Sequence, residues 1–378
     1  MKTYSTLQIT KGPTFNCDDL IKPKLLALSE FSSGTLVSMS PDPGVHYIGN
    51  YKIVLVDGSN GYGSWATLKF MFVAIKESLL MRKQRKLDIV ISYDPFATGV
   101  TASIIKIVSG AKMICEVNGV YDSEEIYKFR SDLKLKFKKF LYPKIQQRVL
   151  KFSDGVKTLF PGQISRFSLR KNTVEACFFD YSNITAGDYR ENQDHYLLTL
   201  GFPAYIKGVD VLIGAFQRLT TDFPLWKLLI VGWFTSKEVK EMNEQAAGNK
   251  NIEIRKPVPF AEIPQLMDSC DIFVLPSRTE AMGRVLIEAM ARGRARIASR
   301  VNGIPTVVND GEDGLLFEKE NIDELEMHLR NLMKSEAARR QFAEKGLRRF
   351  ENEFTLKHYA AHVKNLFDRV DANRDVAN

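Results

Sequence analysis

Two glutamates stand eight residues apart in an arginine-rich stretch of the chain, 278-RTEAMGRVLIEAMARGRARIASR-300. As carboxylates, Glu280 and Glu288 can accept hydrogen bonds from the hydroxyl groups of a sugar or a ribose. The arginines around them can bind phosphate. Such a stretch suits three functions: a basic helix that binds nucleic acid, a salt-bridged surface helix, or a site for a phosphorylated small molecule.

The residues around Glu280 favour the small-molecule site. The apolar run 271-DIFVLP-276 predicts a strand, and a short loop with Glu280 and Gly283 leads from it into a helix that begins near Arg284. At such a junction, unpaired backbone N–H groups and the positive end of the helix dipole form a binding place for phosphate. Gly283 has no Cβ, so the backbone can approach a ligand closely there.

The helix after this loop carries Arg284, Glu288 and Arg292 on one stripe, because residues four apart lie on the same side of a helix. The stripe is either a row of surface ion pairs or the polar edge of a helix that is otherwise buried. The other faces are almost wholly apolar, which favours burial. A buried glutamate needs partners, and the hydroxyls of a ribose would supply them. No role is predicted for Arg296, and three arginines are predicted to be surface charges: Arg292, Arg294 and Arg300.

A second strand-to-helix turn carries a lysine. The apolar run 196-YLLTLG-201 predicts a strand that ends at Gly201, and 209-VDVLIGAFQRL-219 predicts an amphipathic helix. Lys207 lies in the turn between them, so it is expected at the same sheet edge as Glu280. A lysine before a glycine is usually just solvated. Beside the Glu280 loop it is a point charge that can stabilise a departing diphosphate.

Short apolar, β-branched runs alternate with longer amphipathic stretches, a pattern typical of parallel-sheet α/β folds. The polar, turn-rich residues 180–194 predict a linker. The predicted fold class is α/β, with two doubly wound, Rossmann-like domains that face each other across a cleft. The predicted parts are an N-terminal domain, a C-terminal domain and a last helix that packs back on the first domain: residues 1–185, 186–355 and 356–378. The predicted strands are residues 35–39, 53–57, 88–92, 112–117, 155–160, 196–201, 227–232, 252–255, 271–276 and 296–299.

The composition favours anionic partners, because the chain of 378 residues has a formal net charge of +8 and a pI of about 9.1. None of its four cysteines forms a CxxC pair, which suits a reducing compartment. The sequence contains no segment typical of a signal peptide and no run of about 18 apolar residues, the length of a membrane span. We therefore expect a cytoplasmic protein that can bind the inner face of the cell membrane without crossing it.

No metal site and no nicotinamide site are predicted. The loop 57-DGSNGYGS-64 has GxxGxG spacing instead of GxGxxG, so it is interpreted as an ordinary turn. His358 and His362 have the spacing of a zinc-binding helix, but Tyr359 takes the place of the required glutamate. No two aspartates are separated by a single residue, which removes a pair that often holds a metal ion on a diphosphate.

Together these residues resemble the retaining glycosyltransferases of family 4, whose GT-B fold has two facing Rossmann-like domains. The resemblance extends from about residue 196 to 318 and includes LGFPAYIKGVDVLIGAF at 200–216. It also includes EAMGRVLIEAMARG at 280–293, which is similar to the E-x7-E motif of the family, and continues through 301-VNGIP-305 and 310-DGEDGLLF-317. It implies a metal-independent hexosyltransferase that needs no cofactor, uses a UDP- or GDP-sugar and retains the anomeric configuration.

The resemblance also implies a role for each site residue. Glu280 would contact hydroxyls of the donor sugar and Lys207 would neutralise the diphosphate, while Asn118 takes the place of a histidine found in many members. These three are the implied catalytic residues. Domain 1–185 would bind the acceptor and domain 186–355 the donor. The implied donor-binding residues are Glu288 at the ribose, Val258 near the base, Gly201 at the strand end, and the amides of Ala281, Met282, Gly283 and Arg284.

Three positions depart from the family pattern. Phe202 follows the strand-end glycine where an arginine is usual, so one of two cations expected at the diphosphate is missing, and Arg284 is our candidate to replace it. Ala295 and Arg296 stand where Pro-Val is usual. The loop 11-KGPTFN-16 lacks the paired glycines often found there.

The implied partners are a nucleotide-sugar donor and a saccharide acceptor. Residues 128–151 contain nine Lys or Arg and one acidic residue, and the run up to Pro143 predicts an amphipathic helix that either binds an anionic membrane or packs on the sheet. If it binds a membrane, the acceptor is a lipid-linked saccharide, as in the assembly of bacterial lipopolysaccharide or capsule. No RNA-binding motif accompanies the segment, so nucleic acid is not a predicted partner. The alternative function is a catalytically silent GT-B-like subunit that binds a nucleotide sugar or a partner transferase.

Overall fold

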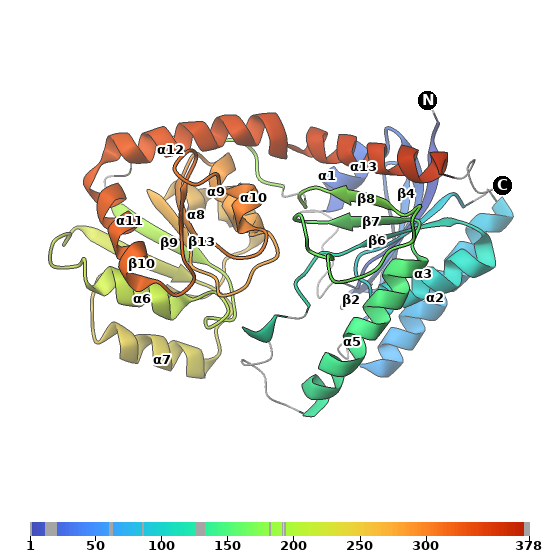
Figure 1. Cartoon of the computed structure of the whole chain (residues 1–378), viewed down its shortest axis with the longest axis horizontal. Helices are drawn as coiled ribbons and strands as arrows, with labels where there is room; N and C mark the ends of the chain where they lie inside the picture. Colours follow the sequence, from blue (N-terminus) through green and yellow to red (C-terminus); the bar gives the residue numbers. More distant parts are fainter. Residues whose placement is uncertain are drawn as a thin grey trace. The chain divides into compact units, whose positions relative to one another are not determined.

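The chain folds into two compact units, each built on a sheet of parallel or mostly parallel strands with helices on both faces (Figure 1). The prediction of two Rossmann-like α/β domains is thereby confirmed. Unit 1 comprises Met1–Asp122, Asp132–Tyr181 and Leu356–Asn378, and unit 2 comprises Ser123–Ser131 and Ser182–Thr355. The computed structural model describes residues 2–11, 21–59, 63–84, 87–121, 123–125, 133–180, 183–190, 192 and 194–373, without the side chains of 133–138.

Unit 1 contains an eight-stranded sheet in the order β3-β4-β2-β1-β5-β6-β7-β8. Strand β3 runs antiparallel to β4, and the other described neighbours are parallel. Figure 1 shows α2, α3 and α5 on one face of this sheet and α1 and α13 on the other. The elements are β1 (Tyr4–Ile9), α1 (Lys22–Leu28), β2 (Ser32–Ser40), β3 (Gly44–Ile48), β4 (Tyr51–Asp57), α2 (Ser64–Gln84), β5 (Ile89–Ser92), α3 (Ala97–Ser109), β6 (Lys112–Glu116), α5 (Leu133–Phe152), β7 (Gly155–Thr158), β8 (Val174–Cys177) and α13 (Leu356–Ala372).

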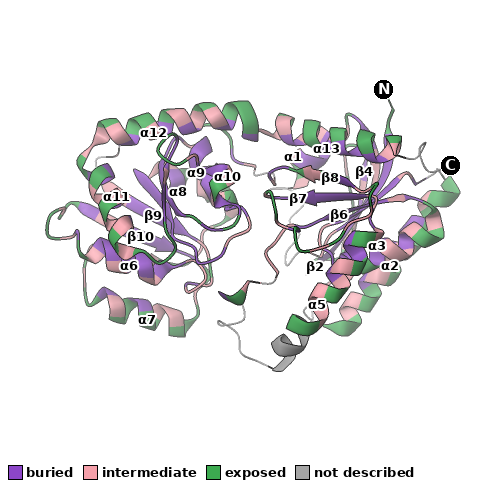
Figure 2. Ribbon diagram, in the orientation of Figure 1, coloured by how far each residue is buried: buried purple, intermediate pink, exposed green. Residues whose placement is uncertain are grey.

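Unit 2 contains a six-stranded parallel sheet in the order β11-β10-β9-β12-β13-β14. Figure 2 shows its strands as the buried centre and the outer sides of its helices as exposed. The elements are β9 (His195–Leu200), α6 (Val209–Gln217), β10 (Trp226–Val231), α7 (Ser236–Ala246), β11 (Ile252–Arg255), η2 (Phe260–Glu262), α8 (Ile263–Asp268), β12 (Ile272–Leu275), α9 (Arg284–Ala291), β13 (Ala295–Ser299), α10 (Ile304–Val307), β14 (Leu315–Phe317), α11 (Ile322–Lys334), α12 (Glu336–Arg349) and η3 (Phe350–Phe354).

The strand order of unit 2 creates a place for a ligand. From β9 the chain adds β10 and β11 on one side of the sheet, and then β12, β13 and β14 on the other. The loops that leave the carboxyl ends of β9 and β12 therefore diverge and leave a crevice, which is where open parallel sheets bind ligands. Both sequence-predicted catalytic residues of this unit, Lys207 and Glu280, follow these two strands.

Four strands lie outside the predicted ones: β1, β3, β8 and β14. Strand β1 is central to its sheet, although Ser5, Thr6 and Gln8 make it half polar. All three are buried because β2 and β5 pair with β1 on both sides. The strands were predicted from runs of apolar residues. Strand β1 was missed because about half of its buried side chains are polar.

Two of the arginines after Glu288 are not surface charges, so that prediction is wrong for Arg292, which is half-buried, and for Arg294, which is buried. The Arg294 guanidinium is almost fully buried and donates to the carbonyls of Asp188 and Arg190 at 3.0 and 2.9 Å. Arg292 pairs with Asp268, with its Nε 2.8 Å from Oδ1, and also donates to the carbonyl of residue 185 at 3.2 Å. Much of the predicted linker is therefore fastened to unit 2. Arg300 is a surface charge as predicted, since it is exposed and paired with the carboxylate of residue 310.

Arg296, for which the sequence predicted no role, lies in the core of unit 2. It belongs to β13, which forms despite the departure from Pro-Val. Its Nη2 is 2.8 Å from Oδ1 of Asp313, and Arg349 approaches the other oxygen of the same carboxylate at 2.8 Å. Burial lowers the pKa of Arg296 to about 10, and the nearby charge of Asp313 opposes that shift. Arg296 thus joins β13 to α12 through one shared aspartate.

The last helix and the basic segment complete unit 1. In α13, Asp368 accepts a hydrogen bond from the hydroxyl of Tyr4 at 2.7 Å, and the Phe367 ring packs on the Tyr4 ring. Helix α5 continues through Pro143 to Phe152, so the basic helix does not end at the proline. Parts of four discussed segments lie outside the described residues: 12–16, 60–62, 128–132, and residues 181, 182, 191 and 193 of the predicted linker.

Candidate active site

The turn after β9 brings Lys207 to the carboxyl edge of the unit 2 sheet. Gly201 ends the strand with φ 131°, and a Cβ there would lie 2.8 Å from Cε of Lys207, so the lysine side chain lies directly over this glycine. Gly208 follows with φ 64°, and a Cβ there would be 2.0 Å from the carbonyl oxygen of Pro276. Only glycine fits this contact, because it has no Cβ. Gly208 therefore allows the turn after β9 to pack closely against the end of β12.

Glu280 lies in the loop that follows β12, and its carboxylate forms an ion pair with the ammonium of Lys207. The other carboxylate oxygen accepts from the backbone N–H of Ala281 at 3.2 Å. Both side chains are mostly buried but keep some solvent exposure. The structure thus brings together two predicted catalytic residues that are 73 positions apart in the chain.

The predicted phosphate-binding loop leads into helix α9. Gly283 is the residue before the helix, has φ 78° and provides no side-chain acceptor for the first-turn N–H groups. A Cβ at this position would lie 3.0 Å from Cδ2 of Leu275 and 3.6 Å from Cγ of Glu280. The loop therefore packs tightly against β12, with Met282 buried and Ala281 half-buried.

Helix α9 places Glu288 one turn beyond Arg284, as the sequence predicts. The Nε atom of Arg284 is 3.5 Å from Oε1 of Glu288. The arginine is exposed, whereas the glutamate is buried among the apolar residues of the helix. A carboxylate in such surroundings strongly favours a cation or hydroxyl donors beside it. Arg292, the third member of the predicted stripe, is bound elsewhere.

Four further residues of unit 2 lie at this edge. Val258 is half-buried in the loop after β11. Asn302 follows β13, has φ 44° and donates from Nδ2 to Oγ1 of Thr279 at 3.0 Å, so it supports the Glu280 loop. Trp233 follows β10 and is largely exposed, as is Phe202 after β9. Sequence reasoning did not single out Asn302 or Trp233, although both lie shortly after strands that end at this edge.

Asn118 lies in unit 1, after β6, and its side chain is held by that unit. Its Oδ1 accepts from Nζ of Lys157 at 2.9 Å, and its Nδ2 donates to Oε2 of Glu116 at 2.9 Å and to the carbonyl of Tyr93 at 3.2 Å. Lys157 is fully buried and also lies 3.5 Å from Glu116. Both ends of the amide are therefore engaged, and an amide does not exchange protons as a histidine would.

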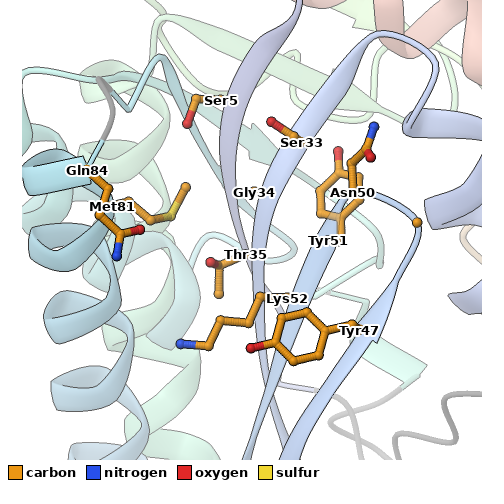
Figure 3. Close-up of a pocket in the computed structure, with 11 residues that line it drawn as sticks. Ser5, Ser33, Gly34, Thr35, Tyr47, Asn50, Tyr51, Lys52, Met81 and Gln84 are labelled. Atoms are coloured by element: carbon orange, nitrogen blue, oxygen red, sulfur yellow. The ribbon is translucent and has the colours of Figure 1, made fainter.

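A cavity of about 560 Å³ in unit 1 lies away from the carboxyl ends of the strands (Figure 3). It is lined by Ser5, Ser33, Tyr51 and Lys52, all at the amino ends of their strands. Nζ of Lys52 is bound to Glu77 at 2.8 Å. Because ligands of doubly wound sheets bind at the carboxyl edge, we do not assign the site to this cavity. Among the described residues, no cluster of three or more His, Cys, Asp or Glu has the arrangement of a metal site.

Residues 187–349, which contain this edge, match the family model described as "Glycosyl transferases group 1". Most of unit 2 is therefore similar in sequence to the group 1 glycosyl transferases. The matched range includes Lys207, Val258, Glu280 and Glu288, but Asn118 lies outside it. Family 4 is a finer assignment than this match and stays a proposal.

A curated protein is also similar in sequence to this chain. An uncharacterized glycosyltransferase from Methanocaldococcus jannaschii is 30% identical over 184 residues, which is 48% of this chain and 50% of that protein. The chain thus matches about half the length of this curated relative.

Two solved structures resemble the fold over nearly the whole chain. Sucrose-phosphate synthase from Thermosynechococcus elongatus has a TM-score of 0.81 at 14% identity, with 98% of this chain and 99% of that chain covered. An Anabaena protein solved with UDP and glucose has a TM-score of 0.68 at 15% identity, with 96% and 99% covered. At these identities the likeness shows the fold, which is the GT-B architecture of the group 1 glycosyl transferases.

Proposed function

We propose that the chain is a retaining family 4 glycosyltransferase that moves a hexosyl unit from a UDP- or GDP-sugar to a hydroxyl of a saccharide acceptor. The observation that carries the proposal is the Lys207–Glu280 ion pair where the loops after β9 and β12 diverge. A cation and a carboxylate at this point match the two ends of a donor: a diphosphate and a sugar with free hydroxyls. The family match of unit 2 supports the same assignment.

In this proposal each residue of the edge binds one part of the donor. Glu280 accepts hydrogen bonds from the sugar hydroxyls and Lys207 faces the diphosphate. The backbone amides from Ala281 to Arg284 line the diphosphate, Glu288 accepts from the ribose hydroxyls, and the loop at Val258 borders the base. Lys207 then exchanges its contact with Glu280 for a contact with phosphate, which is feasible because the pair is not fully buried. The Anabaena neighbour bound to UDP and glucose supports a donor of this kind.

The proposed transfer step depends on the negative charge that develops on the departing phosphate. The bond between the anomeric carbon and the phosphate oxygen breaks, and the acceptor oxygen bonds to the same face of that carbon. The acceptor proton passes to the departing phosphate oxygen, so no protein base is required. Negative charge grows on the phosphate in the transition state, where Lys207 and the first amides of α9 stabilise it. Arg284 supplies a second cation in place of the arginine missing at Phe202.

The acceptor and the metal requirement complete the proposal. Unit 1 binds the acceptor, which is a saccharide carried on a lipid, in the assembly of a bacterial surface polysaccharide. Lys207 and Arg284 neutralise the diphosphate, so transfer proceeds without a divalent cation. Turnover in the presence of excess EDTA, equal to turnover with added magnesium or manganese, checks this point.

One series of measurements tests the proposed function. The full chain is heated with UDP-, GDP- and ADP-sugars to find which of them raises its melting temperature. Release of the matching nucleoside diphosphate is then followed with extracted lipid-linked saccharides as acceptors, and the anomeric proton of the product is assigned by NMR. A product with the donor's configuration is expected. An inverted product contradicts the retaining assignment, and no stabilisation by any donor contradicts the whole proposal.

A second candidate is a catalytically silent subunit that binds a nucleotide sugar or a partner transferase. Two observations favour it: the exposed Phe202 where the family has an arginine, and an Asn118 amide that is fully engaged within unit 1. This candidate predicts stabilisation by a nucleotide sugar with no release of nucleoside diphosphate under any acceptor condition. The same series therefore separates the two.

A further inference from the structure

Helix α2 of unit 1 exposes large apolar side chains along one side. Trp65 is 81% exposed, Phe72 68%, Leu68 57% and Leu79 44%. At about 100° per residue these four positions fall within roughly 60° of arc around the helix axis. They form one continuous row, which we call the outer stripe. Figure 2 colours much of the outer side of α2 as exposed.

The opposite side of α2 already packs on the unit 1 sheet. Phe70, Ala74 and Ser78 are buried there, and Phe70 and Ala74 belong to the core of the unit. The helix is thus apolar on two opposite sides, although packing on the sheet requires only one. A helix that is apolar on all sides is normally buried on all sides. The outer stripe is therefore a surface that favours contact with another apolar surface.

The charges beside the outer stripe are basic. Lys69, Lys76 and Lys83 recur every seven residues, so they form a parallel row along its flank, and all three are exposed. The acidic residue of α2, Glu77, is buried on the other side and bound to Nζ of Lys52 at 2.8 Å. The described face of α2 therefore combines an apolar row with a cationic row and contributes no carboxylate.

The surface continues beyond the outer stripe. An open groove of about 550 Å³ lies along the last turns of α2, between Phe72, Leu79 and the basic side chains of Lys76 and Lys83. Nη1 of Arg82 donates to the carbonyl of residue 108 at 2.6 Å, which joins the ends of α2 and α3. On α3 the neighbouring residue, Ile107, is 72% exposed. Apolar surface thus extends across the ends of two helices.

We propose that the outer stripe of α2 docks unit 1 on an anionic lipid bilayer. The apolar row is long and straight, as a flat interface requires, and Trp65 has the amphipathic ring that favours the headgroup level. The three lysines can extend to lipid phosphates while their alkyl chains lie along the apolar row. A protein partner of matching charge would need an acidic rim around an apolar groove, whereas a bilayer provides both surfaces everywhere.

This assignment moves the predicted membrane contact from residues 128–151 to α2. No described helix has both the length and the apolar character that crossing a membrane requires, so the contact is with the surface. Binding to lipid needs neither donor nor acceptor. Its failure would therefore leave the proposed glycosyl transfer standing, and failure of the transfer would leave the binding measurable.

The test is co-sedimentation of the full chain with vesicles of phosphatidylcholine alone or with three-tenths phosphatidylglycerol. We expect binding to the anionic vesicles that weakens in high salt. Lys69→Glu with Lys76→Glu and Lys83→Glu should lower the partition coefficient at least about tenfold, since each basic residue near the surface contributes. Trp65→Ser with Phe72→Ser should also lower it about tenfold, because less apolar area is buried.

Matched variants control for charge and for apolar exposure. Lys237→Glu with Lys240→Glu and Lys334→Glu makes the same change in net charge in exposed positions of unit 2. Leu225→Ser with Met327→Ser removes two other exposed apolar side chains. Both controls should bind vesicles as the unaltered chain does, and all variants should keep its melting temperature because the altered side chains are exposed.

Three results would overturn the proposal. The first is unchanged binding of both α2 variants. The second is loss of binding in Lys139→Glu with Lys144→Glu and Lys151→Glu, which are exposed residues of α5, while the α2 variants still bind. The third is a dimer in sedimentation velocity that Trp65→Ser with Phe72→Ser dissociates, since the outer stripe would then pair with a second copy of the chain.

Discussion

Each unit contains a Lys–Glu pair near the carboxyl edge of its sheet, and the two pairs differ in their contact with solvent. In unit 2 the side chains of Lys207 and Glu280 are 18% and 17% exposed. In unit 1 those of Lys157 and Glu116 are 0% and 9% exposed, and Asn118 bonds to both of them. The same two residue types therefore form an accessible pair in one unit and an enclosed pair in the other.

The difference separates a binding role from a structural one. A partly exposed pair can open, because water or a ligand phosphate replaces the lost partner. Opening an enclosed pair leaves a charge without compensation, at a cost of about 3–5 kcal/mol. We therefore expect ligand chemistry at Lys207 and Glu280, and stability of unit 1 at Lys157 and Glu116.

The largest expected effect follows from replacing Lys207 with alanine. Because this contact strengthens as charge develops on the departing phosphate, kcat should fall by roughly 10²–10³-fold. The melting temperature should change by no more than about 2 °C, since the pair is partly exposed. Steady-state kinetics and a thermal melt measure both quantities, and Lys207→Arg is the control that keeps the charge.

Two outcomes for Lys207→Ala contradict this role. If only the donor KM rises and kcat is unchanged, the lysine contributes uniform binding rather than stabilisation of the transition state. If the melting temperature falls sharply, the pair is structural like its counterpart in unit 1.

Lys157→Met should show the reverse pattern. It leaves the Glu116 carboxylate buried without its ammonium partner and removes the donor to Asn118, so the free energy of unfolding should fall by about 3 kcal/mol. Adding Glu116→Met should recover part of this loss, because no uncompensated charge then remains. Chemical denaturation of the two variants checks this. Lys157→Met with full stability would mean that this pair is not enclosed in solution.

Glu288→Gln should affect donor binding without affecting the chemical step. The amide keeps the size of the buried side chain but is a weaker acceptor for ribose hydroxyls, so the donor KM should rise about tenfold with kcat nearly unchanged. The nucleotide-free protein should unfold at nearly the same temperature. A fall in kcat with an unchanged KM would place Glu288 at the reacting centre instead of at the ribose.

The smallest expected effect concerns the cation missing at Phe202. Arg284→Ala should lower kcat, and Phe202→Arg in that background should restore it about three- to fivefold, since an exposed charge contributes up to about 1 kcal/mol. Phe202→Lys provides a charge control with different geometry. If neither substitution restores activity, Arg284 does not replace the missing arginine.

The positions of Lys207 and Glu280 at the carboxyl edge of the unit 2 sheet could be predicted because the sequence signals for them are local. The apolar runs before Gly201 and Ser277 are strands, and parallel strands end at the same edge of a sheet, so Lys207 and Glu280 were expected at one edge. That β9 and β12 are adjacent strands became known only from the structure. The direct ion pair of Lys207 and Glu280 could not be predicted, because it depends on how the β9 turn packs. That packing depends on the contact of Gly208 with the carbonyl of Pro276.

The errors concern contacts between residues far apart in the chain. Arginine is usually a surface residue, so Arg294 was predicted to be exposed. Its guanidinium is instead buried, and it donates hydrogen bonds to the backbone carbonyls of Asp188 and Arg190. No local pattern encodes that enclosure. Helix α2 has apolar residues on two sides, so the sequence does not specify which side packs on the sheet. The exposure of Trp65 and Phe72 therefore became evident only from the structure.

The central claim is that the accessible pair of unit 2 binds the diphosphate of a nucleotide sugar. Isothermal titration of the full chain with UDP, GDP and ADP, and with the corresponding nucleosides, tests it most directly. We predict that one diphosphate binds, that Lys207→Ala weakens it at least about tenfold, and that Lys207→Ala leaves the nucleoside affinity unchanged. Binding of the diphosphate with equal affinity to the unaltered chain and to Lys207→Ala, or no binding of any nucleotide, would contradict the account.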